Sequence, residues 1–242
     1  MVTAGFMEKK LNELTGRLQK AFGDRLVSVI LYGSAAGGDY QEAFSDLNVF
    51  CVLTEITPAE LAASEPIFRW WREGGNPAPL LMNRSEVGPS TDCFPIEYQD
   101  MKERRRVLYG EDVVENLVID RRYYRAEVEH ELRSKLIRLR QKAAGVLHDP
   151  DLLVRLMADS VSTFLVLGRH ALLLGGHPCG IGKRGTVSEM AARLGIDVGP
   201  FETLLDVRDR KVGARSLDGA ALFGRYLKSI QSLVAAVDRL EK

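Results

Sequence analysis

The apolar positions in the first 110 residues alternate between helical spacing and short runs rich in β-branched residues. Residues 26–32 (LVSVILY) and 46–53 (DLNVFCVL) predict two buried strands. Shorter strands are predicted at 80–82, at 94–98 (FPIEY) and, as an edge strand, at 106–109. An opening helix that ends at Gly23 is predicted by apolar residues at steps of three to five positions: Phe6, Leu11, Leu14, Leu18 and Phe22.

A second helix is predicted from Pro58 to about Glu73. Thr57 and Glu60 have the capping-box spacing, with proline at the first helical position. The Gly-rich residues 34–43 predict a turn and one short helix between the two buried strands. The first part of the chain therefore mixes helices and strands.

After Gly110 the apolar spacing becomes helical throughout. Stripes of apolar residues predict helices over 128–147 and 152–174, and three more near 186–194, 199–211 and 218–241. We therefore expect an α+β domain over residues 1–118 and an all-α helical bundle over residues 119–242.

The charge of the chain is balanced overall but divided between its halves. The 33 Lys and Arg residues equal the 33 Asp and Glu residues. Residues 1–120 hold 12 basic and 19 acidic residues, and residues 121–242 hold 21 basic and 14 acidic ones. A net charge of zero argues against nucleic-acid or membrane binding through bulk positive charge. The division indicates two bodies with different tasks.

The cysteines and the apolar segments predict a cytoplasmic protein without membrane spans. The three cysteines have no CxxC spacing, so neither a disulfide scaffold nor a structural zinc site is expected. Lys9 and Lys10 interrupt the start of the chain, which argues against a secretory leader. Arg169 and His170 interrupt the longest apolar stretch.

The chemistry is concentrated around Gly33-Ser34 and Asp46-Leu47-Asn48, which eleven residues separate. A strand that ends in Gly-Ser and leads into a helix offers backbone N–H groups and a hydroxyl to a phosphate. Asp46 and Asn48 are two positions apart on a strand, so their side chains share one face. Oxygen ligands beside a phosphate cradle predict a Mg²⁺–nucleotide site.

Glu97 is the best candidate for a third acidic ligand. It lies in the predicted strand 94–98, where Phe94 and Ile96 alternate with it and would point to the buried face. Asp92 and Asp100 are the alternatives.

These residues resemble the DNA polymerase β-like nucleotidyltransferase superfamily over roughly residues 24–110. That family has a Gly-Ser turn, an Asp-x-Asp or Asp-x-Glu strand and a third acidic residue on a later strand. The matching positions are Gly33, Ser34, Asp46, Asn48 and Glu97. The resemblance implies an α+β nucleotidyltransferase-like domain with a mixed β-sheet, followed by an all-α helical bundle domain.

The resemblance also implies an activity. It is the transfer of a nucleoside monophosphate from an NTP to an acceptor, with Mg²⁺ or Mn²⁺. Asp46, Asn48 and Glu97 would ligate the metal, Asp46 and Glu97 as the catalytic acids. Gly33 and Ser34 would hold the phosphates. The sequence identifies neither the acceptor nor the preferred NTP, and it leaves a homodimer open.

Two departures from the family pattern keep other functions open. Asn48 replaces the second carboxylate, so an amide oxygen without charge would ligate the metal. The loop after Ser34 (Ala35, Ala36, Gly37, Gly38) carries no basic side chain, where many relatives have arginine. A catalytically degenerate protein that binds a nucleotide or a partner is therefore the main alternative. A helical-bundle protein that dimerises or binds RNA is the other.

Basic residues outside the motif have two interpretations each. Lys183 and Arg184, in a Gly-rich connection, could reach the triphosphate or form part of a plain helix–helix turn. The run of Lys102, Arg104, Arg105 and Arg106 could pair with phosphate, but a solvated face is the favoured interpretation.

Overall fold

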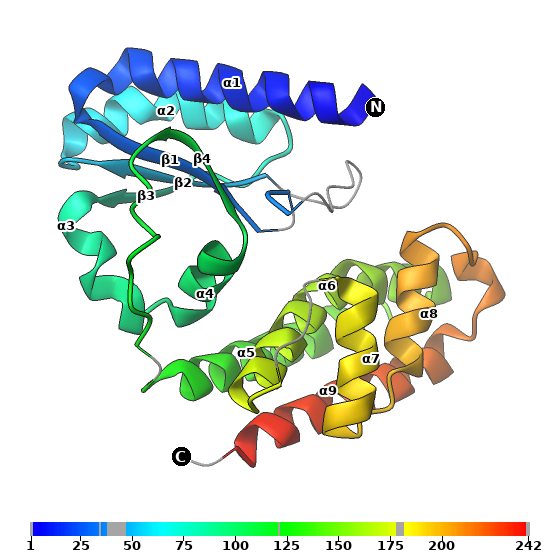
Figure 1. Cartoon of the computed structure of the whole chain (residues 1–242). Helices are drawn as coiled ribbons and strands as arrows, with labels where there is room; N and C mark the ends of the chain where they lie inside the picture. The colour runs from blue at the N-terminus through cyan, green and yellow to red at the C-terminus, as the bar shows by residue number, and fades with distance from the viewer. Residues whose placement is uncertain (1, 34, 38–46, 121, 178–181, 241–242) are drawn as a thin grey trace. The chain divides into compact units, whose positions relative to one another are not determined.

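The structure is a computed structural model that describes residues 2–33, 35–37, 47–120, 122–177 and 182–240. The chain divides into two compact units, Met1–Arg121 and Arg122–Lys242, each of which is described by itself. Figure 1 shows the sheet with its helices in the first unit and the helices of the second.

A four-stranded mixed sheet forms the centre of the first unit. Its strands are β1 (Leu26–Tyr32), β2 (Asn48–Leu53), β3 (Leu80–Asn83) and β4 (Arg105–Gly110), in the order β3-β2-β1-β4. β1 is antiparallel to both β2 and β4, whereas β2 and β3 are parallel. The predicted mixed sheet is confirmed, and β4 is an edge strand as expected.

Two helices cover one face of this sheet, α1 (Val2–Phe22) and α2 (Pro58–Glu73) (Figure 1). The apolar stripe of α1 packs with Val29, Leu31 and Val49 in one buried cluster. The predicted capping box begins α2, where the backbone N–H of Thr57 donates to Glu60 at 3.0 Å. Apolar spacing thus placed α1, the capping box placed α2, and the β-branched runs placed both buried strands.

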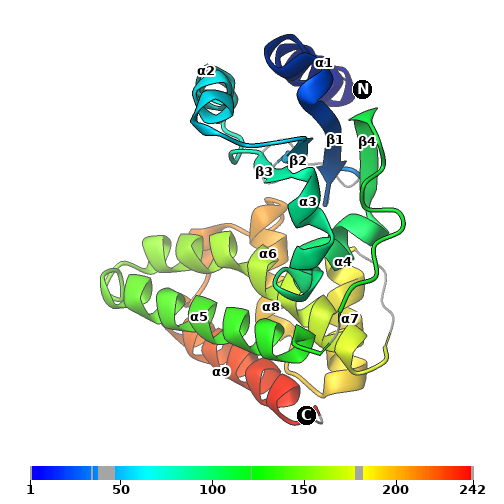
Figure 2. The ribbon, with the colours of Figure 1, turned by 90° about the vertical axis from the view of Figure 1, so that its left-hand side faces the viewer.

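The other face is covered by short helices: α3 (Arg84–Val87), a 3₁₀ turn (Pro89–Asp92) and α4 (Pro95–Glu103) (Figure 2). The strand predicted at 94–98 is wrong, because this segment begins α4. Pro95 is at the helix start, and Pro95, Tyr98 and Met101 are buried at helical spacing. Phe94, which the alternating pattern placed in the core, is 44% exposed.

The second unit is helical throughout its described residues, as predicted. It contains α5 (Tyr124–Ala144), α6 (Pro150–Leu174), α7 (Lys183–Leu194), α8 (Gly199–Arg208) and α9 (Gly219–Asp238). α6 packs against each of the other four helices. Its Phe164 meets Tyr226 edge to face at 6.0 Å, and Phe201 meets the same ring at 5.3 Å. Among the described helices, none has the length and apolar character that a bilayer span requires.

Candidate functional site

The ends of three strands bring the first site residues into one row. Tyr32, the last residue of β1, pairs with Asn48 of β2 on one side and with Arg105 of β4 on the other. Directly paired residues of antiparallel strands point to the same face of a sheet. Tyr32 packs with the cluster under α4, so this row of side chains lies on that face.

The turn after β1 is held against both neighbouring strands. Gly33 has φ +79°, a left-handed conformation that favours glycine. Its N–H donates to the carbonyl of Arg104 at 3.2 Å, and its own carbonyl accepts from the N–H of Ala36 at 3.1 Å. A Cβ at Gly33 would stand 3.3 Å from Nδ2 of Asn48. Gly33 and Asn48, predicted to share one site, therefore lie side by side.

Two of the predicted site residues, Ser34 and Asp46, lie outside the described residues. Their roles at the phosphates and the metal remain predictions. Leu47, between Asp46 and Asn48, is fully buried in the cluster beneath α1 and α2. This burial places Asn48 on the opposite face of its strand, toward α4.

Arg104 supplies a cation to the Gly-rich loop that sequence reasoning took to be bare. A Cβ at Gly37 would stand 2.6 Å from Cδ and Nη1 of Arg104 and 2.8 Å from Cζ. The guanidinium therefore lies directly against the Gly37 backbone. Arg104 belongs to the basic run at 102–106, whose pairing with phosphate was the less favoured interpretation of the sequence.

The two arginines that follow Arg104 in that basic run form ion pairs within the unit. Nε of Arg105 donates to both carboxylate oxygens of Asp112, at 2.9 and 2.8 Å. Arg106 pairs with Glu8 of α1 at 2.7 Å. The Arg105 pair is therefore shielded from solvent in large part, whereas the Arg106 pair lies on the solvated surface that the sequence predicted.

Glu97 lies on α4 rather than on a strand, and its side chain is exposed. It nevertheless acts on the row at the strand ends. Burial, followed by the negative charges of Glu97 and Asp100, raises the pKa of Tyr32 from 10.0 to about 12. Two acidic side chains of α4 are thus electrostatically close to the end of β1.

Two predicted site residues remain: Asp92, an alternative metal ligand, and Lys183, a candidate contact of the triphosphate. Asp92 ends the 3₁₀ turn, and its buried Oδ1 has no hydrogen-bond partner among the described residues. Lys183 is the first residue of α7 in the second unit, so its predicted contact with a triphosphate stays a prediction. Its neighbour Arg184 pairs with Asp206 at 2.8 Å and Asp209 at 2.6 Å.

The donor set at the strand ends fits a hard cation in part. The described residues contain no group of three His, Cys, Asp or Glu side chains that could hold a metal ion. Asp46, the main predicted ligand, is outside them. Asn48 can offer an amide oxygen, and Glu97 and Asp100 add negative charge nearby. Oxygen donors of this kind suit Mg²⁺, although one carboxylate fewer weakens the site.

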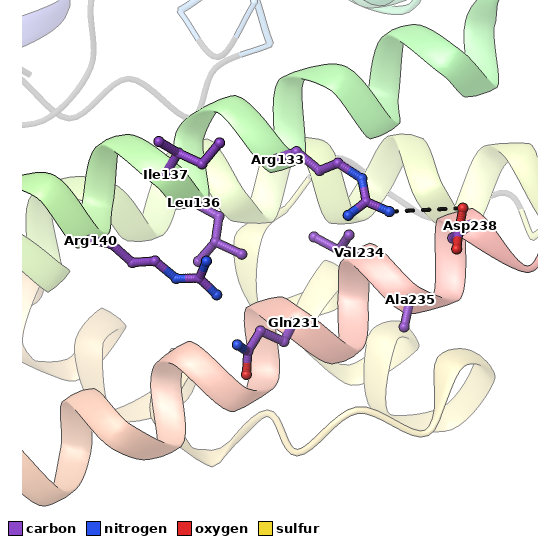
Figure 3. Close-up of a pocket in the computed structure, with 8 residues that line it drawn as sticks. All are labelled: Arg133, Leu136, Ile137, Arg140, Gln231, Val234, Ala235 and Asp238. Carbon is purple, nitrogen blue, oxygen red and sulfur yellow. Dashed lines mark ion pairs between the residues drawn. The ribbon is translucent and has the colours of Figure 1, made fainter.

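A groove in the second unit carries none of the predicted site residues. It has a volume of about 430 Å³ and runs between α5 and α9 (Figure 3). An ion pair of 3.8 Å joins Arg133 of α5 to Asp238 of α9 among the residues that line it (Figure 3). Its lining consists of Arg133, Leu136, Ile137, Arg140, Gln231, Val234, Ala235 and Asp238.

Comparison with known proteins gives a likeness in structure alone. No family model matches the chain, and no curated protein matches it in sequence. A solved structure of spectinomycin adenyltransferase from Enterococcus faecialis, with ATP and spectinomycin, is similar with a TM-score of 0.63 and 14% sequence identity. The likeness covers 96% of this chain and 99% of that one. The likeness shows the fold alone: the chain has an α+β domain with a mixed sheet followed by a helical domain, as the sequence led us to expect.

Proposed function

We propose that the protein is a Mg²⁺-dependent nucleotidyltransferase that transfers a nucleoside monophosphate from an NTP to an acceptor. The observation that carries the proposal is that Gly33 lies beside Asn48 at the paired ends of β1 and β2. It joins the Gly-Ser turn to the Asp-x-Asn strand, the two halves of the sequence motif. The fold likeness to an adenyltransferase supports the same interpretation.

Each residue has a role in this proposal. Gly33 and Ser34 bind the β- and γ-phosphates through backbone N–H groups and a hydroxyl. Asp46 is the chief metal ligand, and Asn48 is a weaker second one. Glu97 is the third ligand, or it accepts the proton of the acceptor hydroxyl. A bound Mg²⁺ or Mn²⁺ would supply charge stabilisation at the transferring phosphoryl group.

The similar adenyltransferase was solved with ATP and spectinomycin, which makes ATP the first nucleotide to test here. The acceptor is a separate question, because acceptor choice depends on loops and helices outside the metal motif. Aminoglycosides, protein hydroxyls and RNA ends all present a nucleophilic oxygen. We assign the reaction class and leave the acceptor to the assay.

The test is a transfer assay with α-labelled NTPs and Mg²⁺ or Mn²⁺ against those three acceptor classes. We expect label on one acceptor and its loss in the Asp46→Ala variant. Asp24→Ala removes an exposed carboxylate of the same unit and should leave transfer unchanged. Failure of MgATP and MgGTP to bind in calorimetry would refute the proposed site.

A second candidate function is nucleotide binding without catalysis. It is favoured by the row at the strand ends, where Asn48 is neutral and Arg105 is a cation already paired with Asp112. A row of this kind binds a pair of metal ions more weakly than a row of carboxylates would. Asn48→Asp separates the two candidates, because a degenerate protein should gain transfer while an active enzyme should change modestly.

A further inference from the structure

The Gly-rich loop after β1 needs a positive charge if it is to bind a triphosphate tightly. Backbone N–H groups and a hydroxyl provide partial charges, whereas a guanidinium provides a full charge and two parallel donors. The loop itself has no basic side chain at 35–38. The cation must therefore come from another part of the fold.

Arg104 is fixed at this loop by three separate contacts. Its own N–H donates to the carbonyl of Asp100 at 2.8 Å and ends α4. Its carbonyl accepts from the N–H of Gly33. Its guanidinium lies over the backbone of Gly37, at a distance that leaves no room for a Cβ. Main chain and side chain together place the positive charge at the turn.

Gly37 has a specific reason to be glycine. Its φ is not among the positive values of the chain, so backbone conformation does not demand glycine there. A Cβ there would instead collide with the end of the Arg104 side chain, which would have to move aside. A residue with a Cβ at position 37 would displace the guanidinium from the loop, although the positive charge of Arg104 would still be present.

Resting on the proposed function, we propose that Arg104 is the phosphate-binding cation of this turn. It substitutes, from the junction of α4 and β4, for the arginine that the loop lacks. Its ligand is the polyphosphate of an NTP, which the planar guanidinium can hold with two N–H donors. The nucleoside makes no part of this contact, so pyrophosphate should depend on Arg104 as ATP does.

The neighbouring arginines are unsuited to that task. Arg105 is committed to Asp112, and both side chains are largely buried, at 18% and 26% exposure. Arg106 is opposite Leu31 in the strand register, and Leu31 packs in the cluster beneath α1. Arg106 therefore lies on the α1 face of the sheet, where it forms an ion pair with Glu8. Arg104, by contrast, has its guanidinium against Gly37 of the Gly-rich loop.

The experiment is calorimetric binding of MgATP and of magnesium pyrophosphate to the full chain and its variants. Arg104→Gln should weaken both ligands by about tenfold or more, since charge-assisted hydrogen bonds have that worth. Arg104→Lys, which keeps the charge, should recover most of the affinity. If the role of Arg104 were purely structural, both variants would lose the same affinity for the two ligands.

Two further variants sharpen the result. Gly37→Ala should weaken both ligands, because it displaces the guanidinium without removing it. Arg84→Ala is the matched control. Arg84 forms an ion pair of 3.5 Å with Glu111, not with the Gly-rich loop. Thermal melting checks that each variant is folded.

The outcomes separate this inference from the proposed function. If the unmodified protein binds neither ligand, the proposed function itself fails. If it binds both and Arg104→Gln binds them equally well, only the role of Arg104 is overturned. Loss of ATP with retention of pyrophosphate would also overturn it, because the contact would then be with the nucleoside.

Discussion

The side-chain amide of Asn48 limits what can stand at position 33, since a Cβ on Gly33 would lie 3.3 Å from its Nδ2. The same glycine has a left-handed backbone that any other residue adopts at a cost. Conformation and crowding therefore act together at the point where the turn meets β2.

Gly33→Ala should lower the free energy of unfolding by about 1–2 kcal/mol and also weaken MgATP binding. Gly75→Ala is the control, because Gly75 has φ +84° but nothing near its Cβ position. Gly75→Ala should lower the free energy of unfolding through its backbone conformation but leave MgATP binding unchanged. Urea unfolding and calorimetry measure the two effects. Equal loss of binding in both variants would contradict a specific role for Gly33.

Asn48→Asp should strengthen divalent-cation binding by about tenfold, because a carboxylate adds charge to the ligand set. Binding of Mn²⁺, followed by its magnetic resonance, reports this directly. Asn76→Asp makes the same chemical change at the turn after α2 and should leave Mn²⁺ binding unaltered. A null result at Asn48, with the protein folded, would mean that position 48 does not face the cation.

The phenol of Tyr32 provides a test of the charges on α4. Its pKa rises from 10.0 to about 12 through burial and then through Glu97 and Asp100. Glu97→Gln and Asp100→Asn should each lower this pKa, as measured by ultraviolet titration of the phenolate. Glu103→Gln, on the same helix, is the control variant. An unchanged pKa in both variants would show that these acids lie too far from the strand end.

The same shift has a consequence for stability at high pH. Because the folded pKa lies above the unfolded one, Tyr32 stabilises the fold fully below pH 10. This contribution is lost as the pH rises from 10 towards 12, where the unfolded chain releases its proton first. Tyr32→Phe should therefore flatten the fall in unfolding free energy over that window, as measured by urea unfolding at several pH values.

A buried polar network stabilises the helical unit. The hydroxyl of Tyr124 hydrogen-bonds Nδ1 of His170, and Nη2 of Arg169 lies 3.3 Å from Nε2 of the same ring. Tyr124→Phe should cost about 1–3 kcal/mol, because it removes a hydrogen-bond partner from a buried ring. Tyr123→Phe, at a side chain that is 57% exposed, should change stability by less than about 0.5 kcal/mol. Denaturant unfolding measures both, and equal effects would contradict the network's importance.

The sequence predicted those elements whose signal is local. β1 and β2 are runs of apolar and β-branched residues, and α2 begins at its capping box, so their types follow from adjacent residues. α4 was misread because Phe94, Ile96 and Tyr98 alternate as in a strand. The buried side chains of Tyr98 and Met101, three residues apart, and Pro95 at the start were the competing helical signals.

The candidate site was predictable only in part, for the same reason. Gly33 and Asn48 are brought together by one pairing of adjacent strands, which a motif can encode. Arg104 reaches the loop through the pairing of β1 with β4, elements far apart in the chain. A basic run in a sequence does not show which of its members the sheet register will turn toward a given loop. That information is tertiary.

The order of the strands has a consequence for how the protein is made. β4 is the last strand of its unit in the chain, yet it pairs with the first. A Cβ at Gly110 would stand 2.0 Å from the carbonyl oxygen of Val27, so the two strands close tightly. Until β4 leaves the ribosome, one edge of β1 is open to pairing with another chain. The loop that receives Arg104 is therefore completed in the same folding step that removes this aggregation-prone edge.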